Sequence, residues 1–198
     1  LTLLTHTIFG DLYLIFAAAL GVSVLKLLYE LLRRATYEMA GPVTWDTPIY
    51  WAVGRGMLKG LKPYIDLYDM KPPGIFYLSE LSFGLSGTPF LGHALSAFTV
   101  FAIPAITAAT VWRVAWHKRE TNGYERAMKG GLVLLAFAWG GVAALYAAER
   151  SGEYQVELFG AFFAMLYVWA ITERRLRPAR WVSTLFLAIL LMLPVFFK

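Results

Sequence analysis

Long apolar segments, separated by shorter charged ones, constrain the fold of this sequence more than any other feature. A helix needs about 20 predominantly apolar residues to cross the hydrocarbon core of a bilayer, and the apolar segments come close to that length. Charged residues make up only 16% of the chain, compared with about 25% in an ordinary soluble domain. We therefore predict an all-α, polytopic membrane protein that forms a single transmembrane domain over residues 1–198. Its five transmembrane helices are expected at residues 12–32, 91–112, 130–148, 154–172 and 181–197.

The distribution of basic residues predicts how these helices are oriented. Segments 113–129 and 173–180 hold five and four basic residues, and the positive-inside rule places both in the cytoplasm. Segment 149–157 carries three glutamates and one arginine, and we expect it outside, together with the long loop 33–90. The net charge of +5 thus reflects membrane topology, so we expect membrane lipids and no nucleic acid as partners.

The two ends of the sequence predict that the chain belongs to a larger protein. It begins at Leu1 without a methionine and stops at Lys198, directly after the last apolar segment. Five crossings would also leave the two ends on opposite faces of the membrane. We expect the amino-terminal part of a larger protein, with the missing carboxyl-terminal part or other membrane subunits as partners. The absence of cysteine excludes disulfides and thiolate metal sites.

The long loop 33–90 is predicted to contain two amphipathic helices at the membrane surface. In the first, an apolar residue recurs at every fourth position, and basic residues lie between them, as in a helix suited to the bilayer interface. The second is expected to start at the Pro72-Pro73 pair and to end at the glycines that follow it. The recurring apolar positions of the first helix are Ile49, Val53, Met57 and Leu61.

A composite motif in this loop resembles a known family. The motif consists of Asp46, Tyr50-Trp51-Ala52, Gly60, Pro63-Tyr64, Asp66 and Lys71-Pro72-Pro73. It is similar to the first external loop of the GT-C membrane glycosyltransferases, above all the bacterial aminoarabinose-transferase and protein-mannosyltransferase-like enzymes. The resemblance covers residues 1–198 in the order of the helices, and residues 44–80 in specific residues.

The resemblance implies transfer of a sugar from a polyprenyl-phosphate donor to a lipid, glycan or protein acceptor. The reaction would take place on the external face of a bacterial inner membrane, in the cell envelope. Asp46 matches the acidic residue that the family uses as catalytic base or to orient the acceptor. A carboxylate within hydrogen-bond reach can take the proton of an attacking hydroxyl group. The alternative is that Asp46 only caps a helix.

Lys71 and Tyr64 are the residues expected to bind the donor phosphate. The resemblance places Lys71 near that phosphate, and an ammonium group is a ready phosphate ligand. The ring of Tyr64 offers an aromatic surface for a sugar or an isoprenoid. The alternatives are a lysine that reaches to the membrane interface and an aromatic anchor. Two other acids of the loop, Asp66 and Asp69, are expected to form turns or to pair with neighbouring lysines.

Further acidic residues could assist Asp46. Glu149, Glu153 and Glu157 are spaced four apart and would share one face if the helix at 154–172 extended backward. Glu157 is the best placed of them, and with Asp46 it could hold a divalent cation or contact the acceptor. A solvated helix start is the alternative. The two adjacent acids of some GT-C enzymes are not found beside Asp46.

Functions of other classes are also compatible with the sequence. His93, at the start of the second span, could ligate a haem or chlorophyll, although a histidine there is also typical of the interface. His6 and His117 have no partner at a metal-ligand spacing, so no metal site is predicted from them. The main alternative to an enzyme is a non-catalytic integral subunit with a glycosyltransferase-derived fold, and half of a transporter is the third hypothesis.

Overall fold

The protein is described by a computed structural model over residues 2–40, 46–67, 71–117, 123–151 and 156–176, together with Ile189, Leu190 and Leu193. The described residues form helices and turns and contain no β-strand, which confirms the predicted all-α class. The helices are α1 (Thr2–Ala40), α2 (Asp46–Leu58), α3 (Pro73–Ser86), α4 (Phe90–Ala115), α5 (Gly123–Ser151) and α6 (Val156–Leu176).

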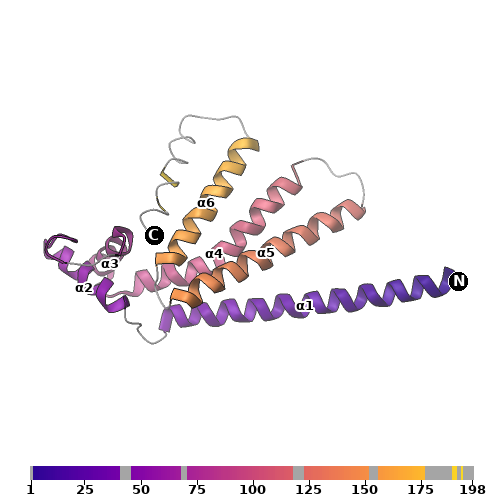
Figure 1. The fold of residues 1–198 in the computed structure, drawn as a ribbon, viewed down its shortest axis with the longest axis horizontal. Coiled ribbons are helices and arrows are strands. Elements are labelled where there is room, and N and C mark those ends of the chain that lie inside the picture. The colour runs from indigo at the N-terminus through magenta and orange to yellow at the C-terminus, as the bar shows by residue number, and fades with distance from the viewer. Residues whose placement is uncertain are drawn as a thin grey trace.

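Four long helices form a bundle, and two short helices pack at one end of it (Figure 1). Helix α4 contacts α1, α5 and α6, and it also contacts α3. Helices α2 and α3 pack against each other at the end of the bundle where α1 ends and α4 begins. At the other end, the amino-terminal part of α1 extends past the other helices. The motif residues carried by α2 and α3 are therefore gathered at one end of the molecule.

The second, third and fourth predicted spans correspond to helices of the bundle. Segments 91–112 and 130–148 lie inside α4 and α5, and α6 covers most of segment 154–172. Two helices are long and apolar enough to cross a membrane, over Phe90–Ala115 and Glu125–Ala148. Within the described ranges no other helix meets that test of length and composition.

The first helix is longer than the predicted segment 12–32. Instead of ending near residue 32, helix α1 continues to Ala40. The predicted loop 33–90 is consequently shorter and largely helical. Of the last predicted span, 181–197, the described residues are helical, and one of them, Leu190, packs with Ala170 of α6. The rest of that span lies outside the described residues.

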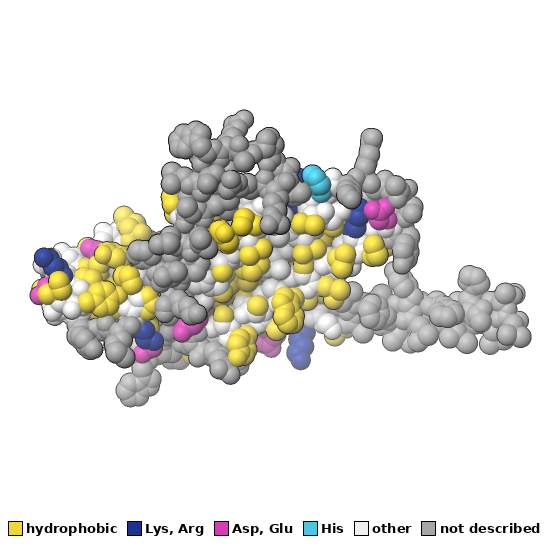
Figure 2. Space-filling model, turned by 45° about the horizontal axis from the view of Figure 1, so that its top comes forward, with side chains coloured by type: hydrophobic (Ala, Val, Ile, Leu, Met, Phe, Trp, Pro, Cys, Tyr) yellow, Lys and Arg dark blue, Asp and Glu magenta, His cyan; other side chains and the backbone are white. Residues whose placement is uncertain are grey.

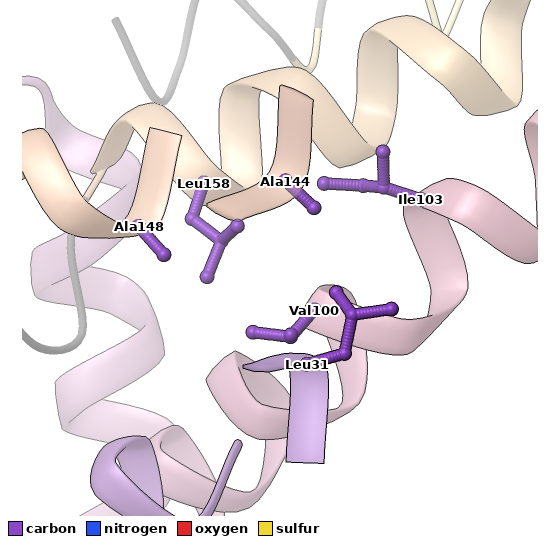
Figure 3. Packing of buried hydrophobic residues seen from close by; sticks show 6 residues of the cluster. All are labelled: Leu31, Val100, Ile103, Ala144, Ala148 and Leu158. Atoms are coloured by element: carbon purple, nitrogen blue, oxygen red, sulfur yellow. The ribbon is translucent and has the colours of Figure 1, made fainter. Parts of the chain in front are cut away.

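The bundle core joins all four long helices through small and branched apolar side chains (Figure 3). Its buried members are Leu31, Val100, Ile103, Ala144, Ala148 and Leu158. Helices α4 and α5 approach each other closely at Gly140. A Cβ atom added there would lie 2.8 Å from the Cα atom of Pro104 and 2.7 Å from Oγ1 of Thr107. Small residues at such crossings let the two backbones approach closely, which improves van der Waals packing between apolar helices.

Helices α2 and α3 form a hairpin that crosses at Gly54. A Cβ atom added there would lie 2.6 Å from Cβ of Ser79 and 2.7 Å from the backbone nitrogen of Glu80. Of the four predicted apolar positions, Val53 is buried and Met57 packs against the same cluster, whereas Ile49 and Leu61 are 45% and 42% exposed and Leu61 lies beyond the end of α2. Close packing against a backbone selects small residues at the contact rather than the largest apolar ones. The buried residues of α2 are Thr47, Tyr50, Val53, Gly54 and Gly56.

Helix α3 begins at the predicted prolines and ends at the second of the two predicted glycines, Gly87, with Gly84 inside the helix. Pro72 is its N-cap and Pro73 its first residue, where the missing N–H of proline costs nothing. Gly87 ends the helix with a φ of 68°, and its N–H donates to the carbonyl of Phe83. Glycine reaches this left-handed conformation without the clash that a Cβ atom would cause.

Candidate functional site

Asp46 and Lys71, predicted as base and phosphate ligand, meet in the folded protein. Helix α2 begins at Asp46, and Lys71 lies directly before the N-cap of α3, so packing of the two helices brings both side chains together. Nζ of Lys71 lies 3.0 Å from Oδ2 of Asp46. The two side chains are 35% and 40% exposed, so a ligand can reach both members of the ion pair.

An apolar cluster adjoins the ion pair. It consists of Tyr50, Val53, Ile75, Phe76 and Phe159, contributed by α2, α3 and α6. The ring of Tyr50 is fully buried, with its centroid 6.1 Å from that of Phe76. The Tyr50 hydroxyl lies 3.5 Å from Oδ2 of Asp46, one helical turn away. Through Phe159 the same cluster fastens the α2–α3 hairpin to the bundle.

A tight turn leads from α2 toward Lys71. The backbone N–H of Lys62 donates to Oδ2 of Asp66 over 2.8 Å, and the N–H of Tyr64 donates to the carbonyl of Leu67 over 2.8 Å. Gly60 before the turn has a φ of 86°, which glycine adopts readily. Asp66 is therefore a turn residue, which is one of the two roles predicted for it, the other being an ion pair with a neighbouring lysine. Its expected counterpart, Asp69, lies outside the described residues.

Tyr64 holds Lys71 in position through the backbone. Its hydroxyl donates to the carbonyl of Lys71 over 2.7 Å, and its ring centroid lies 5.9 Å from that of Phe76. Tyr64 has a φ of 68°, a conformation that costs a non-glycine residue about 1–2 kcal/mol. The surrounding hydrogen bonds offset this cost. Tyr64 therefore acts on the site by orienting Lys71, a role that the sequence analysis did not foresee.

A competing anion could replace Asp46 as the partner of Lys71. Exposed ion pairs contribute only about 0–1 kcal/mol, because water solvates both charges and salt screens their attraction. An anion that approaches Lys71 competes with Asp46 for the same ammonium group. A phosphate offers more charge and more acceptor oxygens than a carboxylate. Phosphate binding at Lys71 would therefore leave Asp46 free to accept a proton.

The other predicted acids are distributed over different elements. Helix α5 continues to Ser151 and α6 begins at Val156, so Glu149 and Glu157 belong to different helices. The condition under which the three glutamates would share one face, a backward extension of the helix at 154–172, is therefore not met. Glu157 is exposed in the first turn of α6, whereas Glu153 and the side chain of Glu149 lie outside the described residues.

A metal site is not apparent in the described part of the chain. No three His, Cys, Asp or Glu side chains gather there closely enough to hold a metal ion. Oδ2 of Asp46 faces Lys71 instead. A divalent cation between Asp46 and Glu157 therefore stays a prediction from sequence.

A second polar cluster, the Glu38 network, is buried near the site and was missed by the sequence analysis. Glu38 has no exposed surface. Its Oε1 lies 2.6 Å from the guanidinium group of Arg34, and its Oε2 accepts a 2.5 Å hydrogen bond from Ser96. Arg34 also donates to the carbonyl of Ala148 over 2.6 Å. The available signal was the four-residue spacing of Arg34 and Glu38, in a segment that was predicted to lie in a loop.

His93 completes the Glu38 network. Its Nδ1 lies 2.6 Å from the carbonyl oxygen of Glu38, and because a carbonyl only accepts, Nδ1 carries the proton. The ring is 9% exposed and meets Trp51 edge-on, with centroids 5.5 Å apart. These contacts give His93 a packing role between α1, α2 and α4, which favours a structural histidine over a haem or chlorophyll ligand.

Comparisons with protein-family models, with curated proteins and with solved structures gave no match. The function is therefore inferred from the residues and their geometry. The contact that carries most of that inference is the ion pair between Asp46 and Lys71.

Proposed function

We propose that this chain is part of a membrane glycosyltransferase that takes a sugar from a polyprenyl-phosphate donor. The observation that supports this proposal is the 3.0 Å ion pair between Asp46 and Lys71. The resemblance assigned these two residues separately, as base and as phosphate ligand. Their meeting gathers both groups at one solvent-open position. The pair must separate to admit the sugar, because the base and the leaving phosphate lie on either side of the same sugar carbon.

The reaction would proceed by displacement at the anomeric carbon of the sugar. The donor phosphate binds Lys71 and separates it from Asp46. As an acceptor hydroxyl oxygen forms its bond to the anomeric carbon, Asp46 takes the hydroxyl proton. The bond between that carbon and the phosphate oxygen breaks, and polyprenyl phosphate leaves with the bonding electron pair. Lys71 stabilises the charge that develops on the phosphate.

The surface of the bundle supports its placement in a membrane. Apolar side chains fill much of the middle of one face, and charged side chains lie around them, toward the two ends and along the lower edge (Figure 2). On α5, large exposed apolar residues recur at intervals of three and four, which is one helical face. A soluble monomer rarely exposes such a continuous patch, whereas lipid would cover it. The residues of this stripe are Met128, Leu132, Leu135, Trp139, Val142 and Tyr146.

The orientation proposed from the basic segments can be tested by labelling. The chain contains no cysteine, so Ile65→Cys and His117→Cys each introduce a single reactive thiol into it. Both positions are exposed. In intact bacterial cells an impermeant maleimide is expected to label Ile65→Cys and to spare His117→Cys, because only the first would face outward. Permeabilised cells, in which both should react, are the control; the reverse pattern in intact cells would refute the orientation.

A second candidate function is a non-catalytic subunit of a membrane complex. The observation that favours it is that the charge of Asp46 is already balanced by Lys71, as in an ion pair that merely fastens α2 to the start of α3. The two functions differ in whether Lys71 binds a ligand. A binding measurement on Lys71 therefore distinguishes them.

Replacement of Lys71 is the experiment that tests the proposed donor site. Lys71→Met keeps the length of the side chain and removes its charge, so binding of a polyprenyl phosphate should weaken by about 10- to 100-fold, the equivalent of one charge-assisted hydrogen bond. Lys59→Met, an exposed lysine beyond the end of α2, is the matched control and should bind normally. Equal affinity of Lys71→Met and the unmodified protein would favour the non-catalytic subunit.

A further inference from the structure

The Glu38 network is an unusual feature because it buries an ion pair among four helices. Removing two charges from water costs several kcal/mol per ion, and good geometry must offset that cost. In this cluster both carboxylate oxygens of Glu38 accept hydrogen bonds, from Arg34 of α1 and Ser96 of α4. A buried carboxylate with both oxygens bonded to different helices fixes the relative positions of those helices.

Arg34 extends the Glu38 network to the end of α5. Ala148 is one of the last four residues of α5, which ends at Ser151, and the carbonyls of those residues have no partner within the helix. The guanidinium group of Arg34 donates to the Ala148 carbonyl over 2.6 Å. A cation at this position also interacts favourably with the negative end of the helix dipole. Arg34 therefore connects the carboxyl-terminal ends of α1 and α5.

His93 extends the network in the other direction, toward the candidate site. The hydrogen bond from Nδ1 to the Glu38 carbonyl sets the orientation of the ring. The ring meets Trp51 of α2 edge-on, with centroids 5.5 Å apart. Trp51 directly follows Tyr50, whose hydroxyl approaches Asp46. A continuous series of contacts thus runs from the bundle interior to the helix that carries Asp46.

We infer that the Glu38 network is a positioning device, which fixes α2 and therefore Asp46 relative to the bundle. The network meets α2 through the contact between His93 and Trp51, so it reaches Asp46 by way of that helix. Loss of the contact between His93 and the Glu38 carbonyl should release α2 while the long helices stay in place. The inference concerns the placement of α2 and does not depend on which reaction the site performs.

Distances between spin labels on the full chain in nanodiscs test this inference. Ala52→Cys with Ala143→Cys reports the distance between α2 and α5, and Val114→Cys with Ala143→Cys reports the distance between α4 and α5; all three positions are exposed. In the background of His93→Leu, the α2–α5 distance distribution should shift or broaden by about 2 Å or more, the size of a typical rearrangement of a released element. The α4–α5 distribution should not change.

A control and a second variant make the result decisive. Thr99→Val removes a buried hydroxyl of α4 that bonds only the Ser96 carbonyl of its own helix, and both distributions should be unchanged. Glu38→Gln keeps the shape of the buried side chain and should also move α2, provided that the labelled protein elutes as one species. An unchanged α2–α5 distribution in His93→Leu would overturn the inference. So would equal broadening of both distributions, because the network would then stabilise the bundle as a whole.

Discussion

Asp46→Asn is expected to lower sugar transfer by about 10²- to 10⁴-fold, the usual contribution of a general base. The same substitution should tighten binding of a polyprenyl phosphate by up to about fivefold, the equivalent of about 1 kcal/mol for an exposed ion pair. Transfer falls because the base is lost. Binding tightens because the Asp46 carboxylate no longer competes with phosphate for Lys71, 3.0 Å away. Asparagine has nearly the same size but carries no charge and takes no proton.

The two effects of Asp46→Asn can be measured separately. Binding is followed by titration with farnesyl phosphate, with farnesol as the uncharged comparison, and turnover with polyprenyl-phosphate sugars in liposomes. Glu80→Gln removes a carboxylate from α3, outside the ion pair, and should leave both measurements unchanged. Near-normal turnover of Asp46→Asn would end its assignment as base. Weaker phosphate binding would show that Asp46 helps to hold the ligand instead of competing with it.

Glu38→Ala is expected to cause a large loss of stability. Removing one partner of a buried ion pair leaves the other charge uncompensated and costs about 3–5 kcal/mol. In Glu38→Ala the uncompensated charge would be the guanidinium group of Arg34, whose side chain is only 12% exposed. The free energy of unfolding can be measured by titration with SDS in mixed micelles.

The matched control for Glu38→Ala lies on the same helix. Glu30 pairs with Arg33 over 2.8 Å, but these side chains are 32% and 61% exposed. Glu30→Ala should therefore cost only about 0–1 kcal/mol. A similar loss in both variants would show that the Glu38 pair is solvated and would remove the physical basis for a buried network. Replacing Arg34 and Glu38 together by methionine should recover much of the stability, because no charge is then left buried.

The sequence alone was sufficient for features that depend on local chemistry. The apolar lengths of α4 and α5 predicted both helices, since a helix bonds the backbone groups of a long apolar segment within the segment itself. The Pro72-Pro73 pair and Gly87 predicted the limits of α3, because proline and glycine restrict or permit backbone angles wherever they occur. Asp66 as a turn residue follows from the same local rules.

The end of α1 could not be predicted from local chemistry. Charged residues are typical of a segment that leaves the membrane, so the predicted span ended before Arg33, Arg34 and Glu38. In the structure α1 continues, because Ser96 and the Ala148 carbonyl supply the hydrogen bonds that a buried ion pair needs. Those partners lie far away in the sequence, so the cost of burial could not be judged without the packed helices.

The candidate site shows the same division. The composition of the loop and its spacing singled out Asp46, Lys71 and Tyr64, and their residue types alone determine that one can take a proton and another can hold a phosphate. Only the tertiary structure decided that Lys71 pairs with Asp46, and that Tyr64 orients Lys71 through its carbonyl. These contacts depend on the close crossing of α2 and α3 at Gly54, and a crossing is a property of two surfaces, which neither segment specifies by itself.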